Sequence, residues 1–175
     1  MKFRIFRFKK VLSTNKTAIR ILKISDFDSG MVVSENQTAG KGQYGKKWIS
    51  LKGNLFVSFF CKFNDLKYTL KQLTVINCFL VKKTLSHFYK GKIFYKKPND
   101  LLINKKKICG ILQEVINEKG INYIIIGIGI NVKKNPKITK YPATNLNDVL
   151  NKDVSKRKIE SKLRKIFEIK LKQIY

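Results

Sequence analysis

The chain has 175 residues, 43% of them hydrophobic and 11% aromatic, which is enough to fold as one domain around a real core. No apolar run reaches the roughly twenty residues that a membrane-spanning helix needs. The first twelve residues alternate Phe and Ile with Arg and Lys, so they lack the continuous apolar stretch of a signal peptide. We therefore expect a cytoplasmic protein with no membrane partner.

The formal net charge of +27 has two explanations, a nucleic-acid-binding face or a solvated basic surface. Lysine supplies nearly all of this charge, and the lysines are spread from one end of the chain to the other. Arginine is the residue that base readout and bidentate phosphate contacts favour, and only five are present. The composition thus favours a solvated basic surface over a nucleic-acid-binding face. A nucleic-acid partner is therefore not expected.

The three cysteines indicate neither a disulfide framework nor a metal site. Cys61, Cys78 and Cys109 are odd in number, widely spaced and set in apolar surroundings. We expect buried free thiols.

The first half of the chain predicts a strand, a helix and two further strands. The first strand lies within residues 1–12, and Ser13-Thr14-Asn15 is typical of a helix start, because short polar side chains can bond the free N–H groups ahead of the amphipathic run 17–24. Residues 31–35 and 54–63 are predicted strands that flank a glycine-rich loop.

The second half continues the alternation. Apolar residues at helical spacing predict a helix over 69–88. An apolar strand follows Asp100, then a tight turn near Asn104-Lys105. Residues 107–116 and 121–132 read as an antiparallel hairpin rich in β-branched side chains, and a last helix covers about 155–173. This mixture predicts an α+β domain in which helices cover a mixed β-sheet.

The loop at residues 36–48 suits polyanion binding. Its glycines are Gly40, Gly42 and Gly45, and its lysines include Lys41, Lys46 and Lys47. Glycines let backbone N–H groups approach a ligand closely, while lysines supply point charges. No helix follows, so the stretch is neither a Walker A loop nor a dinucleotide fingerprint. A solvated surface loop remains the alternative.

A second stretch, residues 95–112, predicts a polar corner. Pro98 favours extended geometry at Lys97, so Asn99 and Asp100 sit at a turn from which both side chains can point at a common centre. Further on, Lys107 opens a strand. An ordinary turn and an exposed edge charge are the alternatives.

Glycines interrupt the bulky strands of the hairpin at Gly110, Gly127 and Gly129. Such gaps often mark close approach of a ligand to a sheet.

Together these motifs resemble, in order, the catalytic domain of biotin–protein ligases, which are relatives of the lipoate ligases and share the fold of class II aminoacyl-tRNA synthetases. Ser13-Thr14-Asn15 is similar to the family's Ser-Thr-Asn, and residues 37–48 to its Gln-Thr-x-Gly-Arg-Gly loop ending in Trp. The remaining matches are Lys96 with Pro98-Asn99-Asp100, Lys107 with Gly110-Ile111-Leu112, Gly127-Ile128-Gly129-Ile130-Asn131, and Ala143-Thr144-Asn145-Leu146.

The resemblance implies a two-step reaction. Biotin is activated by ATP, with Mg²⁺, as biotinyl-5′-AMP, and is then transferred to a lysine of a biotin carboxyl carrier protein. It also implies one catalytic domain over residues 1–175, with neither the N-terminal DNA-binding domain nor the small C-terminal β-barrel domain of some members. A homodimer is compatible with it.

The resemblance also assigns site residues. Lys107 is the expected catalytic residue, bridging the carboxylate of biotin and the α-phosphate. Expected biotin contacts are Ser13, Thr14, Asn15, Gln37, Gly40, Lys41, Gly42, Gln43, Lys107, Gly110 and Gly127. Expected ATP and adenylate contacts are Lys46, Trp48, Asn99, Asp100, Lys107 and Asn131. No metal ligand is certain; Asp100 is the candidate Mg²⁺ contact.

Two departures from the family pattern stand out, Lys97 in place of Trp and Gln43 where arginine is common. Three rival functions stay open. They are a lipoate or octanoate ligase or transferase, a noncatalytic biotin binder, and a basic nucleic-acid-binding module.

Overall fold

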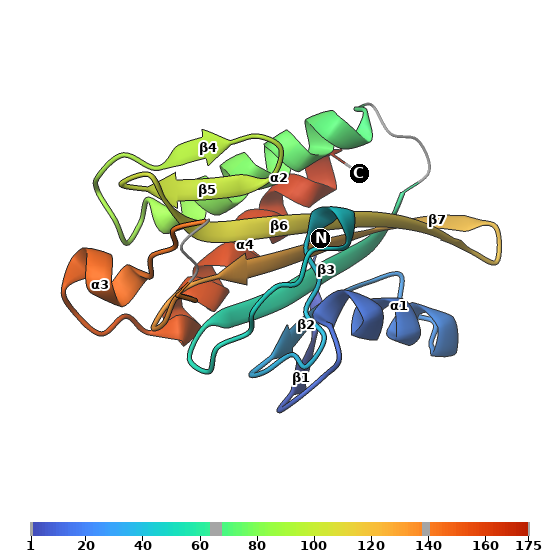
Figure 1. The fold of residues 1–175 in the computed structure, drawn as a ribbon. Coiled ribbons are helices and arrows are strands. Elements are labelled where there is room, and N and C mark those ends of the chain that lie inside the picture. Colours follow the sequence, from blue (N-terminus) through green and yellow to red (C-terminus); the bar gives the residue numbers. More distant parts are fainter. Residues whose placement is uncertain (1, 64–67, 138–140, 175) are drawn as a thin grey trace.

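The computed structural model describes residues 2–63, 68–137 and 141–174. A seven-stranded sheet in the order β1-β2-β3-β7-β6-β5-β4 forms its centre (Figure 1). The strands are β1 (Arg4–Phe8), β2 (Ser29–Ser34), β3 (Leu55–Phe63), β4 (Phe94–Lys96), β5 (Asp100–Ile103), β6 (Lys106–Glu118) and β7 (Ile121–Ile130). The helices are α1 (Thr14–Ile24), the 3₁₀ turn η1 (Gln43–Gly45), α2 (Leu70–Leu85), α3 (Leu146–Leu150) and α4 (Lys156–Ile174).

The sheet is mixed. β1 runs parallel to β2, and every other neighbouring pair is antiparallel. The predicted α+β class with a helix-covered mixed sheet is therefore confirmed.

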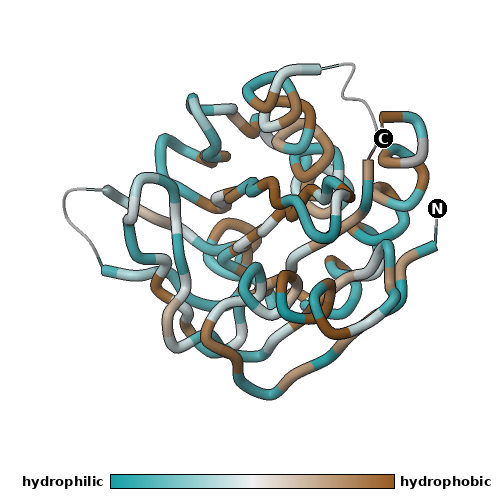
Figure 2. The backbone as a smooth tube through the Cα atoms, turned by 90° about the vertical axis from the view of Figure 1, so that its right-hand side faces the viewer, coloured by the Kyte–Doolittle hydropathy of each residue, from teal (hydrophilic) through white to brown (hydrophobic). Residues whose placement is uncertain are grey.

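Helices cover the two faces of the sheet unequally. α2 and α4 pack on one face over the main core, and α1 packs on the other over a smaller core (Figure 1). Successive side chains of β3 point to opposite faces of the sheet. Phe59 therefore belongs to the main core and Phe60 to the smaller one. In Figure 2, hydrophobic and hydrophilic positions are interleaved along the chain, as packing on both faces of the sheet requires.

Most predicted elements are present with small shifts at their ends. The first strand is shorter than expected, covering only Arg4–Phe8 of residues 1–12. The predicted turns are confirmed, with left-handed backbone at Asn104 and Lys105 and again at Lys119 and Gly120. β4, η1 and α3 were not predicted.

Two other sequence predictions can be checked on the fold. All three cysteines are free and buried, as expected. In the described part of the chain, no helix combines the length and the apolar character needed to cross a bilayer.

Candidate functional site

A cavity of about 350 Å³ opens where β4, β5, β6 and β7 meet the loops around them. Its walls come from the start of α1, the glycine-rich loop, the turn before β5, and residues 136 and 141–143. Segments distant in the sequence are joined here by bridges, Val11 with Gln37 and Lys107 with Ala143.

The indole of Trp48 lies flat against the sheet beside this cavity. A Cβ atom at Gly129 would be 2.4 Å from Cζ2 of Trp48, and one at Gly110 would be 2.8 Å from Cζ3. Both distances are far below normal contact, so only glycine lets the ring approach. The indole N–H is buried and has no hydrogen-bond partner among the described residues.

Gly127 makes room for an amide in the same way. Its Cβ would be 2.3 Å from Oδ1 of Asn15. The Asn15 amide accepts from the hydroxyl of Ser58 and donates to the Leu112 carbonyl and to Glu114 Oε2, the latter at 2.6 Å. In the structure described, Gly110, Gly127 and Gly129 line the cavity, and the close approach of a ligand at these gaps stays a prediction. Protein groups fill them, because the floor of the cavity is built from Trp48 and Asn15.

The start of α1 is held by a glutamine from the glycine-rich loop. Oε1 of Gln37 accepts from the backbone N–H of Thr14 at 2.8 Å and from its hydroxyl at 3.1 Å. Nε2 of Gln37 donates to Ser50 at 3.1 Å. Ser13 occupies the N-cap position as predicted, yet its side chain makes no capping bond. Gln37 supplies that acceptor instead, which leaves the Ser13 hydroxyl to line the cavity.

Lys107 lies at the polar corner predicted from the sequence. Its ammonium is 2.7 Å from Oδ1 of Asp100 and 5.3 Å from the centroid of the Trp48 ring. The side chain is 30% exposed, and it lines the cavity. The alternative of an edge charge facing solvent is therefore contradicted. Asp100 fixes the ammonium electrostatically, and the indole face favours a cation beside it.

Asn99 and Asn131 also line the cavity, although their amides bond to backbone. Nδ2 of Asn99 donates to the carbonyl of Ile111. Asn131 is 2% exposed, and its Nδ2 donates to the carbonyl of Thr144 at 3.1 Å. These bonds join β6 and β7 to the segments that wall the cavity. They support the site whatever further contacts the two residues make.

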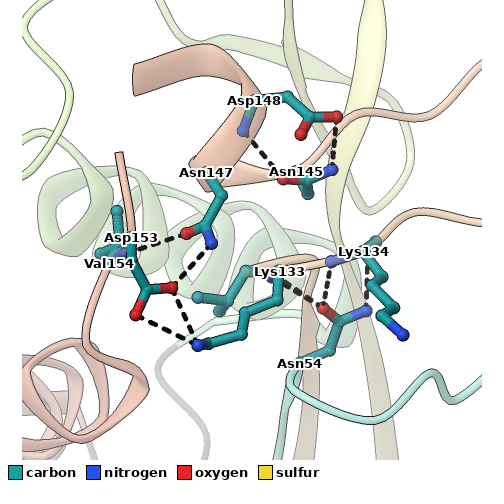
Figure 3. A network of polar contacts seen from close by, with 9 residues as sticks. Asn54, Lys133, Lys134, Asn145, Asn147, Asp148, Asp153 and Val154 are labelled. Carbon is teal, nitrogen blue, oxygen red and sulfur yellow. Dashed lines mark hydrogen bonds and ion pairs between the residues drawn. The ribbon is translucent and has the colours of Figure 1, made fainter. Parts of the chain in front are cut away.

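Asn54 is a supporting residue that sequence reasoning missed. Its Oδ1 accepts from the backbone N–H groups of Val132, Lys133 and Lys134 at 3.0 to 3.1 Å, and its Nδ2 donates to the carbonyl of Lys134 at 2.8 Å (Figure 3). The chain leaving β7 is thereby held in one path. The signal, an Asn directly after Gly53, is hidden in a sequence rich in asparagine.

The glycine-rich loop is an ordered hairpin. Gly42 N–H donates to the carbonyl of Lys46 at 2.7 Å, and η1 forms the tip. Tyr44 occupies left-handed backbone at φ 55°, and the residue is 89% exposed. The ammonium of Lys46 lies 5.3 Å from the ring centroid of Tyr141, across the mouth of the cavity.

All but one of the predicted site residues line the cavity. The exception is Gly40, which is buried, and a Cβ atom there would lie 2.7 Å from the backbone carbonyl oxygen of Trp48. Its contact with a ligand stays a prediction. The structure adds lining residues that were not predicted as site residues, among them Lys47, Lys96, Lys97, Lys105, Leu112 and Tyr141.

The described residues offer no ready-made metal centre. None of the clusters they form holds three or more His, Cys, Asp or Glu side chains placed to bind an ion. Among the described lining residues Asp100 is the single carboxylate, and it is paired with Lys107. A divalent ion here would take most of its oxygen ligands from a bound polyphosphate.

Comparison with known proteins gives consistent matches. The chain matches the Biotin/lipoate A/B protein ligase family over residues 8–131. It is 35% identical over 126 residues to the bifunctional ligase/repressor BirA of Bacillus subtilis, covering 71% of this chain and 39% of that protein. The chain thus spans about two fifths of that curated relative.

Solved structures agree. The biotin protein ligase of Aquifex aeolicus, in complex with biotin and ATP, superposes with a TM-score of 0.81 at 30% identity, covering 97% of this chain and 71% of that one. The biotin protein ligase of Leishmania major, in complex with biotinyl-5-AMP, gives 0.78 at 27% identity, covering 95% and 74%. With its motifs in order, its cavity formed by them and its family match spanning most of its length, this chain belongs to the biotin/lipoate A/B protein ligase family.

Proposed function

We propose that this chain is an ATP-dependent ligase, which activates biotin as biotinyl-5′-AMP and transfers it to a lysine of a biotin carboxyl carrier protein. The observation that carries the proposal is the position of Lys107, whose ammonium faces the cavity beside Asp100 and Trp48. The biotin, ATP and biotinyl-5-AMP named for the similar structures support the choice of substrates.

The first step joins two anions, so it needs a cation between them. The carboxylate of biotin attacks the α-phosphorus, and pyrophosphate leaves. Negative charge builds on the non-bridging oxygens in the transition state, and a fixed ammonium stabilises it without reorganising. Lys107 suits this position because Asp100 holds its side chain at 2.7 Å.

Polar groups at the start of α1 suit the ureido ring of biotin. This ring has two N–H donors and one carbonyl, all of which need partners when buried. The hydroxyls of Ser13 and Thr14 and the amide of Gln37 line the same wall of the cavity. Asn15 contributes indirectly in this proposal, since its amide is already bonded to Ser58, Leu112 and Glu114.

Phosphates would occupy the cationic side of the cavity. Lys46 stands at its mouth near Tyr141, within reach of the outer phosphates in this proposal. Mg²⁺ would be held mainly by phosphate oxygens, with Asp100 as the protein carboxylate that fits. Closure of the glycine-rich hairpin over the adenylate would limit hydrolysis of the mixed anhydride.

A lipoate ligase is the rival that the family itself leaves open, because its members act on either cofactor. Binding calorimetry with biotin and with lipoate, each with and without a nonhydrolysable ATP analogue, separates the two. We expect binding of biotin, tightened by the nucleotide, and weak or no binding of lipoate. Tighter binding of lipoate would reverse the assignment.

Formation of the adenylate tests the reaction directly. The chain is mixed with biotin, Mg²⁺ and ATP, and biotinyl-5′-AMP is measured by mass spectrometry. Lys107→Ala should reduce its formation by about 10²- to 10³-fold, as expected for loss of one preorganised charge. Lys106→Ala, which removes the exposed neighbouring ammonium outside the cavity, is the matched control and should retain the rate. Equal rates for the two variants would refute the role of Lys107.

A further inference from the structure

Lysine dominates the lining of the cavity. Seven lysines and a single aspartate line it, which is a formal balance of +6. Lys41, Lys46 and Lys47 come from the glycine-rich hairpin, Lys96 and Lys97 from the end of β4 and the residue after it, and Lys105 and Lys107 from the β5–β6 turn and the start of β6. Tyr44 and Tyr141 are the other titratable side chains among the described lining residues.

Most of this charge is unpaired within the described chain. Lys107 is bound to Asp100, and none of the other six lining lysines lies within 4 Å of a carboxylate among the residues described. Lys96, Lys97 and Lys105 are exposed at the mouth, and we call them the rim lysines. Lys96 pairs with Asp100 in the β4–β5 ladder, and Lys105 precedes Lys107 by two residues, so all three border the Asp100–Lys107 corner.

The second step of the proposed reaction needs a neutral amine. The amine nitrogen forms a bond to the carbonyl carbon of the adenylate, the bond from that carbon to the phosphate oxygen breaks, and AMP leaves with the electron pair while the amine loses a proton to solvent. A free lysine has a pKa of about 10.4, so nearly all of it is ammonium at neutral pH. The described lining offers no histidine and no carboxylate besides the paired Asp100 to take the proton.

We propose that the rim lysines activate the incoming lysine of the carrier by lowering its pKa through like-charge repulsion, so that the cavity needs no general base. This inference rests on the proposed function. Once pyrophosphate has left, the bound adenylate carries one negative charge against the +6 of the lining. An ammonium entering this field is disfavoured relative to the neutral amine. Every unit by which the pKa falls makes about ten times more neutral amine available.

Two acceptors of different basicity test this proposal. Synthetic biotinyl-5′-AMP is bound to the protein, which makes the test independent of adenylate formation, and transfer is followed to Nα-acetyl-lysine amide and to hydroxylamine. Hydroxylamine is already neutral at pH 7 and gains nothing from the field. The triple variant Lys96→Gln, Lys97→Gln, Lys105→Gln should slow transfer to acetyl-lysine amide by about tenfold at pH 7 and leave transfer to hydroxylamine unchanged. In the triple variant, the rate of transfer to acetyl-lysine amide should begin to rise at a pH about one unit higher.

Charge-matched variants complete the test. The three Lys→Arg substitutions keep the charge and should retain both rates. A second triple variant, Lys83→Gln with Lys90→Gln and Lys158→Gln, removes three exposed lysines outside the cavity. It should also retain both transfer rates. If the rim-lysine variant slowed transfer to both acceptors equally, adenylate binding would be disturbed and the inference would be overturned. No slowing, or no transfer above the rate of free adenylate in solution, would overturn it as well. Failure to make adenylate from ATP would refute only the proposed function.

Discussion

At the scale of single residues, the contact between Trp48 and Gly129 decides the floor of the cavity. A methyl group at 129 would lie 2.4 Å from the indole, so either the ring or β7 must move. Gly129→Ala should destabilise the fold by about 1–3 kcal/mol, the usual cost of overpacking. Trp48 is the only tryptophan, so its fluorescence reports this site alone, and the emission should shift to the red as the ring loses its place. Urea unfolding monitored by that emission measures both effects.

Gly42→Ala is the matched control for this variant. A Cβ at Gly42 meets nothing closer than 3.5 Å, and its backbone φ of −112° suits any residue. Stability and emission should therefore change little. A red shift of equal size in both variants would show that the indole is not held by Gly129.

Residue-scale reasoning from the sequence identified positions of close approach, and it did not identify the protein side chains that approach there. Spacing marked Gly110, Gly127 and Gly129 as places where a group comes close to the sheet, and in the fold protein side chains do so. The approaching groups are Trp48 and Asn15, which come from distant segments. A pattern along one strand shows that space is left open, and it carries no information about which side chain enters from across the fold.

At the scale of elements, Asn54 holds residues 132–134, the start of the chain that leaves β7. Asn54→Ala would leave three backbone N–H groups without their acceptor, at a cost of about 1–3 kcal/mol. Hydrogen exchange at residues 132–134 should become markedly faster. Asn54→Asp keeps an oxygen acceptor and should preserve the protection of these amides. Unchanged exchange in the alanine variant would contradict the clamp.

Elements that the sequence missed share a physical reason. β4 has three residues and α3 five, too few for a period to be visible. α3 depends on Asn145, whose side chain accepts from the N–H of Asp148, and the adjoining segment is fixed by contacts around Asn147 and Asp153 (Figure 3). Longer elements such as α2 and β7 were predictable because their periodicity extends over many residues.

At the scale of the whole molecule, the net charge of +27 could be interpreted only after folding. Along the sequence the lysines look evenly spread. In the part of the fold that the structure describes, seven of them meet around one cavity with a single carboxylate. They converge because the sheet brings together the glycine-rich hairpin, the end of β4 and the start of β6 with the turn before it. The order of the motifs was therefore readable from the sequence, and the charge balance of the site was not.

The three buried thiols report on the stability of this whole assembly. Burial raises the pKa of Cys61 to about 12, and burial also raises the pKa of Cys109 well above its ordinary value. An exposed thiol in the unfolded chain has a pKa of about 8.5, so the folded state holds its protons to higher pH. The resulting stabilisation is complete below about pH 8.5 and decreases as the pH rises toward the folded-state values.

Labelling by a thiol reagent should therefore proceed through unfolding, because a buried protonated thiol is neither accessible nor nucleophilic. At pH 8 all three cysteines should react slowly and at a common rate. Biotin at about 100 times its dissociation constant should stabilise the native state by about 2.7 kcal/mol and slow labelling by about 100-fold. Mass spectrometry of the labelled chain over time measures the rate for each thiol. Cys109 lies in β6 next to Gly110, the glycine that packs against the indole. If Cys109 alone reacted quickly, at a rate that biotin did not change, its labelling would proceed through local opening near the site and not through global unfolding.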